Sequence, residues 1–168
     1  MELSIKSTLL FTAVILTGLS AGLFFAWSVS VIPGTKRIGD ATYLATMQSI
    51  NKAIINPAFA LIFFGSLVLL AIITFQQFQT GTSTTFWLLL TATIVYAIGT
   101  LGVTGFGNVP LNNALEALDL NHLSLNQMKT FRDHYELKWN RLHTIRTLFA
   151  ILSFMVALQA VFIHIKTN

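Results

Sequence analysis

The sequence predicts an all-α protein, a four-helix transmembrane bundle that forms one domain over residues 1–168. Hydrophobic residues make up 54% of the chain and charged residues only 10%, whereas soluble domains carry about 25% charged residues. Four apolar stretches are long enough to cross a hydrocarbon core, which takes about 20 residues of helix. In addition, no Gly or Pro occurs between residues 124 and 168, so a single long helix should end the chain.

The composition also excludes several classes of site. Cysteine is absent, so there are no disulfides, no thiolate metal sites and no cysteine nucleophile. The net charge of +4 does not indicate nucleic acid, because the basic residues cluster beside apolar runs, where Lys and Arg anchor membrane proteins. We therefore expect membrane lipids as partners and no nucleic acid.

The first span covers about residues 8–32. It continues through "GLFFAWSVSVIP" and is too long for the apolar region of a signal peptide, so we interpret it as a retained helix. Small residues four apart form a ridge that would let a neighbouring helix approach closely in lipid: Gly18, Gly22, Ala26 and Ser30. Trp27, near the end of the span, could anchor the helix at the interface or contact a ligand.

The first long loop should contain a short interfacial helix. Pro33-Gly34 ends the first span by turn chemistry. In the following segment, "YLATMQSINKAI", Asn51 shares one helical face with a set of apolar residues: Leu44, Met47, Ile50 and Ile54. Asn56-Pro57 then starts the second span, about 57–76, because Asn suits the N-cap and Pro the first helical position.

The third span, about 85–107, is expected to break at "TGFGNVPLNN" (104–113). Non-helical backbone at membrane depth is tolerated where it is buried in protein or lines a cavity. Asn108, Asn112 and Asn113 could hold a ligand there, or they could cap helix ends.

The last helix begins at Ser124, where "SLNQ" is a capping-box pattern. A helix of roughly 40 residues would be about 60 Å long. Its second half, about 144–165, would form the fourth span, and its first half would extend beyond the membrane.

Charge in the loops predicts an orientation. The two long loops, 33–56 and 108–143, carry seven basic residues, whereas the 77–84 connection carries none. The positive-inside rule therefore favours cytoplasmic long loops. We expect a multi-pass protein of the bacterial inner (plasma) membrane, with both termini on one side.

The last helix carries a polar stripe. At about 100° per residue, one face holds Arg132, Glu136, Asn140, His143 and Thr147. Trp139 and Arg146 flank this face, and Lys138 and Arg141 lie on the other side, where they can meet water or head groups. Ionisable groups at membrane depth are costly. The stripe is therefore either a salt-bridged interfacial helix or one wall of a polar cavity between helices.

The spacing of Glu and His residues along the sequence gives little support for a metal site. Glu136 and His143 are seven residues apart, too far to chelate as an i,i+4 pair would, and the Glu-x-x-His pair of carboxylate bundles is absent. Haem or a metal bound through His143 stays open, since one axial ligand suffices for haem.

Four motifs, taken in order, resemble the anthrone oxygenase-like family of small four-helix membrane proteins. They are "GLFFAWSVSVIPG" (22–34), "MQSINKAIINPAF" (47–59), "FGNVPLNNAL" (106–115) and "WNRLHTIRT" (139–147). The characterised relatives oxidise anthrones to anthraquinones with O2, without metal, flavin or haem. The resemblance thus implies a cofactor-independent monooxygenase that takes O2 and an apolar phenolic or anthrone-like substrate.

If the resemblance extends to chemistry, roles can be assigned to residues. His143 would be the base that removes the acidic CH2 proton, and Glu136 would orient it. Stabilisation of the enolate oxygen would come from guanidinium and amide groups, as in an oxyanion hole: Arg132, Arg146, Asn108, Asn112 and Asn140. Trp27 and Trp139 would stack on the rings, and Asn51 would contribute to substrate binding.

Two other readings of the same residues remain. The chain could be a non-enzymatic membrane protein that binds a quinone, a lipid or a partner subunit, or it could bind haem or a metal. The small-residue ridge and the long helix would also serve a homo-oligomer.

Overall fold

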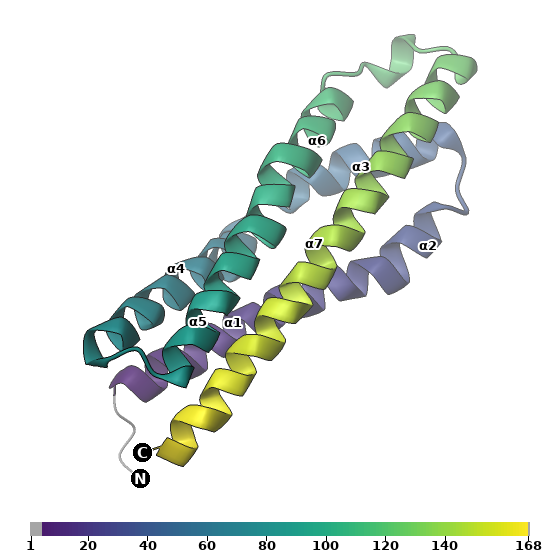
Figure 1. Ribbon diagram of the computed structural model, residues 1–168. Coiled ribbons are helices and arrows are strands. Elements are labelled where there is room, and N and C mark those ends of the chain that lie inside the picture. The colour runs from purple at the N-terminus through teal and green to yellow at the C-terminus, as the bar shows by residue number, and fades with distance from the viewer. Residues whose placement is uncertain (1–4, 168) are drawn as a thin grey trace.

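The computed structural model describes residues 5–167, and every regular element in that range is helical (Figure 1). Four helices form the main body of the bundle: α1 (Ile5–Ala26), α4 (Pro57–Thr80), α5 (Thr84–Val95) and α7 (Leu125–Thr167). The remaining elements are η1 (Trp27–Val31), α2 (Ile32–Thr35), α3 (Asp40–Ala53), η2 (Tyr96–Gly102), η3 (Thr104–Asn108), α6 (Val109–Glu116) and η4 (Leu120–His122).

Four helical stretches are long and apolar enough to cross a membrane, as the sequence predicts. They are Ile5–Thr35, Pro57–Thr80, Thr84–Glu116 and Leu125–Ile165. In the ring that they form, α1 packs against α4 and α7, and α5 packs against α4 and α7. Figure 1 shows α1 beginning at the end of the bundle where α7 finishes. The chain is therefore a multi-pass membrane protein with both ends of the described chain on one side.

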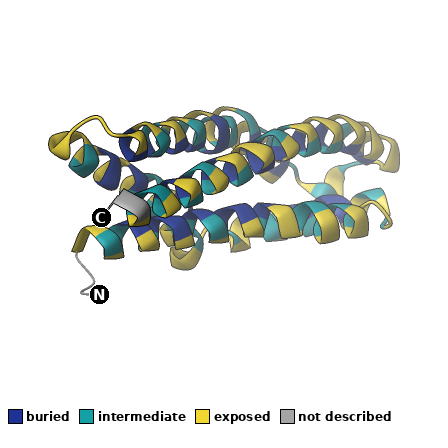
Figure 2. Ribbon diagram, turned by 60° about the horizontal axis from the view of Figure 1, so that its bottom comes forward, coloured by how far each residue is buried: buried dark blue, intermediate teal, exposed yellow. Residues whose placement is uncertain are grey.

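Large apolar side chains cover the outside of the bundle. Phe11, Phe75 and Phe162 are each 61% exposed, and in Figure 2 the exposed residues lie along the outer faces of the helices. Contiguous apolar surface of this kind is rare on soluble monomers. Lipid is the solvent in which these faces are stable.

Inside the bundle, polar groups find partners across helices. The Tyr96 hydroxyl lies 2.7 Å from the Ser20 hydroxyl and donates to the Phe63 carbonyl at 3.0 Å. The Ser153 hydroxyl donates to the Ala92 carbonyl at 2.8 Å. Such bonds satisfy side chains that hydrocarbon cannot solvate and fix the neighbouring helices against one another.

Of the two glycines in the predicted small-residue ridge, only one lies in close contact with a neighbouring helix. A Cβ added at Gly18 would lie 2.9 Å from the ring of Phe154 on α7, whereas one at Gly22 would meet nothing within 4 Å. The tightest approach is elsewhere, at Gly99, where an added Cβ would lie 2.0 Å from Phe149. The close contact between η2 and α7 is therefore possible because Gly99 has no side chain.

The expected break at 104–113 is wrong. The chain stays helical from Thr84 to Glu116, passing through the two π-helical segments η2 and η3 before α6. Pro110 lies in the first turn of α6, where its missing N–H costs least. The wider π turns change which residues face inward without opening the helix, and π segments are frequent at functional sites.

Two helix starts confirm the cap patterns in the sequence. The Asn56 side chain accepts a hydrogen bond from the Phe59 amide at 2.9 Å, with Pro57 in the first turn of α4. At the start of α7, the Gln127 amide donates to the Ser124 hydroxyl at 3.3 Å, and the Ser124 amide donates to Gln127 Oε1 at 2.8 Å.

The predicted interfacial helix is α3, and it forms a small domain-like cap with α6 and the first half of α7. Its buried residues come from all three helices: Tyr43, Leu44, Met47, Leu115, Met128, Tyr135 and Trp139. The Gln48 amide also donates to the carbonyls of Leu115 and Leu118 at 2.9 and 3.0 Å. This packing holds the end of α3 over the mouth of the bundle.

Candidate functional site

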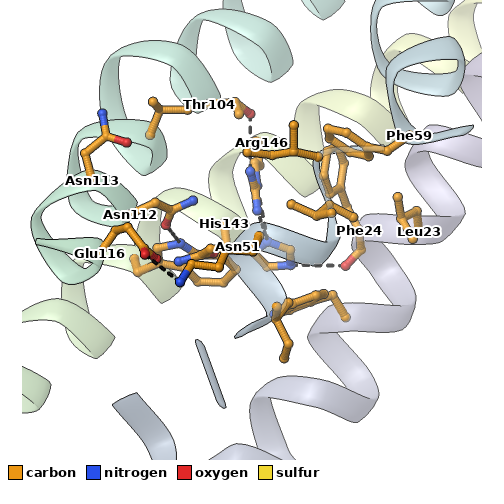
Figure 3. Close-up of a pocket in the computed structure, with 17 residues that line it drawn as sticks. Leu23, Phe24, Asn51, Phe59, Thr104, Asn112, Asn113, Glu116, His143 and Arg146 are labelled. Carbon is orange, nitrogen blue, oxygen red and sulfur yellow. Dashed lines mark hydrogen bonds and ion pairs between the residues drawn. The ribbon is translucent and has the colours of Figure 1, made fainter. Parts of the chain in front are cut away.

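A cavity of about 340 Å³ lies where the membrane bundle meets the cap (Figure 3). Ligand pockets of small molecules typically have about 300–1,000 Å³. Most of the lining is apolar and aromatic, with a few polar groups: Leu23, Phe24, Trp27, Ile50, Asn51, Lys52, Ile54, Ile55, Phe59, Thr104, Val109, Asn112, Asn113, Glu116, Trp139, His143 and Arg146. In Figure 3 the α6 residues face Leu23 and Phe24 of α1 across this space.

Aromatic rings form one wall of the cavity. The Trp139 and His143 rings, one turn apart on α7, stack with 5.0 Å between centroids and 7° between planes. Trp27, the first residue of η1, lies 5.7 Å from Trp139, and Phe24 meets His143 edge-on at 6.0 Å. A flat, apolar ligand would find a matching surface here.

Arg146 is a buried cation in this cavity, only 8% exposed. Its Nε and one terminal nitrogen lie 3.2 and 3.0 Å from His143 Nδ1, and its other terminal nitrogen donates to Thr104 Oγ1 at 3.3 Å. Among the residues that the structure describes, no carboxylate forms an ion pair with it. Three of the five N–H groups of a guanidinium are thus engaged, all by neutral acceptors.

His143 is fully buried, and both of its ring nitrogens are hydrogen-bonded. Because Arg146 can only donate, Nδ1 is the acceptor and Nε2 carries the proton. Nε2 donates to the Phe24 carbonyl at 3.1 Å and also lies 3.1 Å from the Ser28 hydroxyl. The basic lone pair on His143 Nδ1 is therefore occupied by hydrogen bonds from the guanidinium of Arg146.

Asn112 orients two aromatic residues. Its Oδ1 accepts hydrogen bonds from Trp139 Nε1 at 2.8 Å and from the Tyr135 hydroxyl at 3.2 Å. Asn51 donates to the same Tyr135 hydroxyl at 3.5 Å. With its oxygen held by two donors, Asn112 keeps its amide N–H groups as donors for a ligand.

The outer rim contains residues that the sequence reasoning missed. Lys52 of α3 and Glu116 of α6 form an ion pair of 2.7 Å at the rim, both well exposed. Thr104 and Phe24 also line the cavity. Lys52 and Glu116 lie 64 positions apart (116 − 52) in the sequence, so no local pattern could reveal the pair.

Six of the ten predicted site residues line this cavity: Trp27, Asn51, Asn112, Trp139, His143 and Arg146. Asn108 is buried and does not line the cavity. Its side-chain amide donates to the Trp139 carbonyl at 3.3 Å, and its Oδ1 has no hydrogen-bond partner among the residues that the structure describes. Asn140 lies on a different cleft, together with Glu136.

Arg132 and Glu136 belong to a separate structural network. Arg132 pairs with Glu136 at 2.8 Å and with Asp40 at 3.0 Å, and it donates to the carbonyls of Ile38 and Thr35. Its guanidinium also lies 4.3 Å from the Tyr43 ring centroid. Burial and then the Glu136 charge raise the pKa of Tyr43 above its ordinary value. The network joins the segment between α2 and α3 to α7.

No group of three His, Asp or Glu side chains suited to a metal ion occurs in residues 5–165, whose side chains the structure describes. A haem or metal ligated by His143 would have to replace the bonds that its ring nitrogens already make to Arg146 or to Phe24 and Ser28.

Comparison with protein families decides the relationship. Residues 58–156 match the model of the anthrone oxygenase family, which is more than half of the chain. The chain belongs to the anthrone oxygenase family. No curated protein and no solved structure matches it.

The region that matches the family model contributes part of the cavity lining. Thr104, Asn112, Trp139, His143 and Arg146 fall inside the matched region, and so do the motifs at 106–115 and 139–147. The wall made by α1, η1 and α3 precedes the match. His143, Arg146 and Asn112 thus lie within the part of the chain that the family model matches, whereas Asn51 and Lys52 precede it.

Proposed function

We propose that this protein oxidises an electron-rich phenolic or anthrone-like apolar substrate with O2 in the cavity beside Arg146. The observation that carries the proposal is a buried guanidinium without a carboxylate partner, in a cavity walled by aromatic rings. A buried charge needs compensation, and a flat ligand that becomes anionic during its reaction supplies it. The family membership supports the same chemistry.

The reaction can be written with all atoms balanced. Removal of one proton from the CH2 of an anthrone gives a delocalised enolate. The enolate passes one electron to O2, the carbon radical and superoxide combine to a peroxide, and protonation gives a hydroperoxide. Loss of water from the hydroperoxide leaves the quinone carbonyl, so one anthrone and one O2 yield one anthraquinone and one water. The electrons come from the substrate, and none has to be supplied by a cofactor.

Arg146 would stabilise the enolate oxygen. Two N–H groups of Arg146 remain for a ligand, and the amide N–H groups of Asn112 line the same cavity. Donors placed where negative charge develops act strongly in a water-poor site. The roles in enolate stabilisation first considered for Arg132, Asn108 and Asn140 have less support, because these residues do not line the cavity.

His143 would take the substrate proton on Nδ1. This requires Arg146 to exchange its bond with Nδ1 for a bond with the substrate oxygen. The exchange couples the two events, because the lone pair becomes free only when an oxygen has engaged the guanidinium. Glu136, which is paired with Arg132, would take no part in orienting His143.

The experiment is O2 consumption by the purified protein in mild detergent with anthrone as the substrate. We expect consumption of one O2 per anthraquinone formed, in protein whose metal content and visible spectrum are recorded first. Tight binding of anthrone without turnover would instead indicate a membrane protein that binds a quinone or related ligand. A stoichiometric metal or a Soret band would replace the cofactor-independent mechanism.

A further inference from the structure

A second cleft lies on the outside of α7, away from the cavity. It is lined by Lys36, which follows α2, and by six residues of α7: Asp133, Glu136, Leu137, Asn140, Arg141 and Thr144. It shares no lining residue with the cavity beside Arg146.

The two carboxylates and the two cations that line this cleft differ in their ion-pair partners. Its two carboxylates are already paired with neighbours, Asp133 with Lys129 at 2.7 Å and Glu136 with Arg132 at 2.8 Å. Lys36 and Arg141 have no ion-pair partner in the described part of the chain. The cleft therefore presents two cations to whatever occupies it, and Arg and Lys together suit a phosphate group.

The position of the cleft along α7 matters as much as its charge. Thr144 stands where the apolar half of α7 begins. The helical face of Thr144 continues through Leu148 and Met155, which are 62% and 61% exposed. A ligand with an anionic head and an apolar chain would meet cations at one end of this face and hydrocarbon-like side chains along the rest.

We propose that this cleft binds the headgroup of an anionic phospholipid. Lys36 and Arg141 hold the phosphate, the Asn140 amide adds a donor, and an acyl chain lies along Leu148 and Met155. Basic pockets between transmembrane helices bind anionic head groups in this manner. The site would couple α2 to α7 from outside, at the level where Arg132 couples them from inside.

The test compares thermal unfolding of the purified protein in nanodiscs of phosphatidylcholine with unfolding in an equal mixture of phosphatidylglycerol and phosphatidylcholine. We expect a higher Tm with phosphatidylglycerol for the wild type. The double variant Lys36→Gln/Arg141→Gln should lose most of this rise while keeping the wild-type Tm in phosphatidylcholine. Lys36→Arg/Arg141→Lys, which retains both charges, should keep it.

Lys138→Gln is the matched control, because Lys138 is an exposed cation of α7 that does not line the cleft and has no ion pair with any residue that the structure describes. The proposal is overturned if Lys138→Gln removes the rise as fully as the double variant does, since the attraction would then be diffuse. It is equally overturned if phosphatidylglycerol gives no rise in the wild type, or if inorganic phosphate gives the same rise in phosphatidylcholine nanodiscs. Native mass spectrometry of the same variants supplies a count of retained phosphatidylglycerol that does not depend on unfolding.

Discussion

At the scale of single residues, Arg146 is the buried cation of the cavity. It is held by Thr104 and His143 and stacked between the rings of Phe24 and Trp139, 4.7 and 5.1 Å from their centroids. These contacts fix the guanidinium without neutralising it. In the proposed function, its positive charge is available to a ligand anion.

Replacement of Arg146 by Gln should lower kcat/KM for anthrone by about 10²–10³, the usual cost of losing one oxyanion donor. The protein should still fold, because Gln removes a buried cation that has no carboxylate partner. Steady-state O2 uptake measures the effect. Lys138→Gln, an exposed change on the same helix, should leave the rate unchanged; an equal loss in both variants would argue against a role of Arg146 in the cavity.

Replacement of His143 by Phe tests the base. Phe can keep the stacking on Trp139 but cannot accept a proton, so we expect a loss of about 10²–10⁴ in kcat. Circular dichroism and gel filtration in detergent confirm that the variant is folded. Full activity in that folded variant would remove His143 from the mechanism.

At the scale of secondary-structure elements, the contact between η2 and α7 at Gly99 leaves the least space for a side chain among the glycines that the structure describes. The atoms that an added Cβ at Gly99 would meet are Cβ, Cγ and Cδ1 of Phe149, at 2.0–2.5 Å. These atoms lie close to the α7 backbone, so they cannot move aside without moving the helix. The close approach also positions Arg146, whose backbone carbonyl accepts a bond from Thr100 of η2.

Gly99→Ala should therefore destabilise the protein by about 1–3 kcal/mol, the usual cost of overpacking, and lower its Tm in detergent. Gly105→Ala is the matched control on the same helical stretch, because nothing lies within 4 Å of its added Cβ. A similar Tm for both variants would contradict the contact described here.

The Arg132 network joins elements and is expected to act on stability rather than on chemistry. Arg132→Gln removes hydrogen bonds to Glu136, Asp40 and two carbonyls. Bonds of a charged group contribute about 1.5–3 kcal/mol each at most, so a clear drop in Tm is expected.

The same Arg132→Gln protein should keep the wild-type kcat below its melting range, because Arg132 does not line the cavity. Lys129→Gln, which removes the exposed pair with Asp133, is the control and should leave the Tm nearly unchanged, because exposed ion pairs contribute little to stability. A loss of kcat in Arg132→Gln at unchanged Tm would return this residue to the catalytic group.

At the scale of the whole molecule, one end of the bundle carries the cap and the cavity, and the other carries both ends of the described chain. Residues 33–56 and 108–143, at the cap end, include seven basic residues, whereas the α4–α5 connection at the opposite end includes none. By the positive-inside rule, we predict that the cap faces the cytoplasm.

This orientation is testable because the natural chain lacks cysteine. Single Thr82→Cys and Asn121→Cys variants report the two ends in intact cells treated with a membrane-impermeant maleimide. We expect labelling at position 82 before permeabilisation and at position 121 only afterwards. The reverse pattern would put the cap outside.

The sequence predicted those features that depend on local patterns. Apolar run lengths predicted the four spans, cap residues predicted the starts of α4 and α7, and helical spacing brought His143, Trp139 and Arg146 together. Features that depend on contacts across the bundle were missed or misjudged. Arg132 and Glu136 share a helical face with His143 but lie nearer the N-terminal end of α7. There, Ile38 and Asp40 form hydrogen bonds with Arg132. The π-helical path through 104–108 likewise replaced the expected break.

The claim that Arg146 binds an anionic ligand is tested most directly by the charge of a bound ligand. A hydroxyanthraquinone is a suitable probe, because its phenolate absorbs at longer wavelength than its phenol. Its absorption spectrum would be recorded with wild-type protein and with Arg146→Gln, at a pH where the free probe is neutral. We expect that the wild type binds the phenolate and that the variant binds the phenol or does not bind. A neutral probe bound to the wild type, or an anionic probe bound equally well by Arg146→Gln, would contradict it.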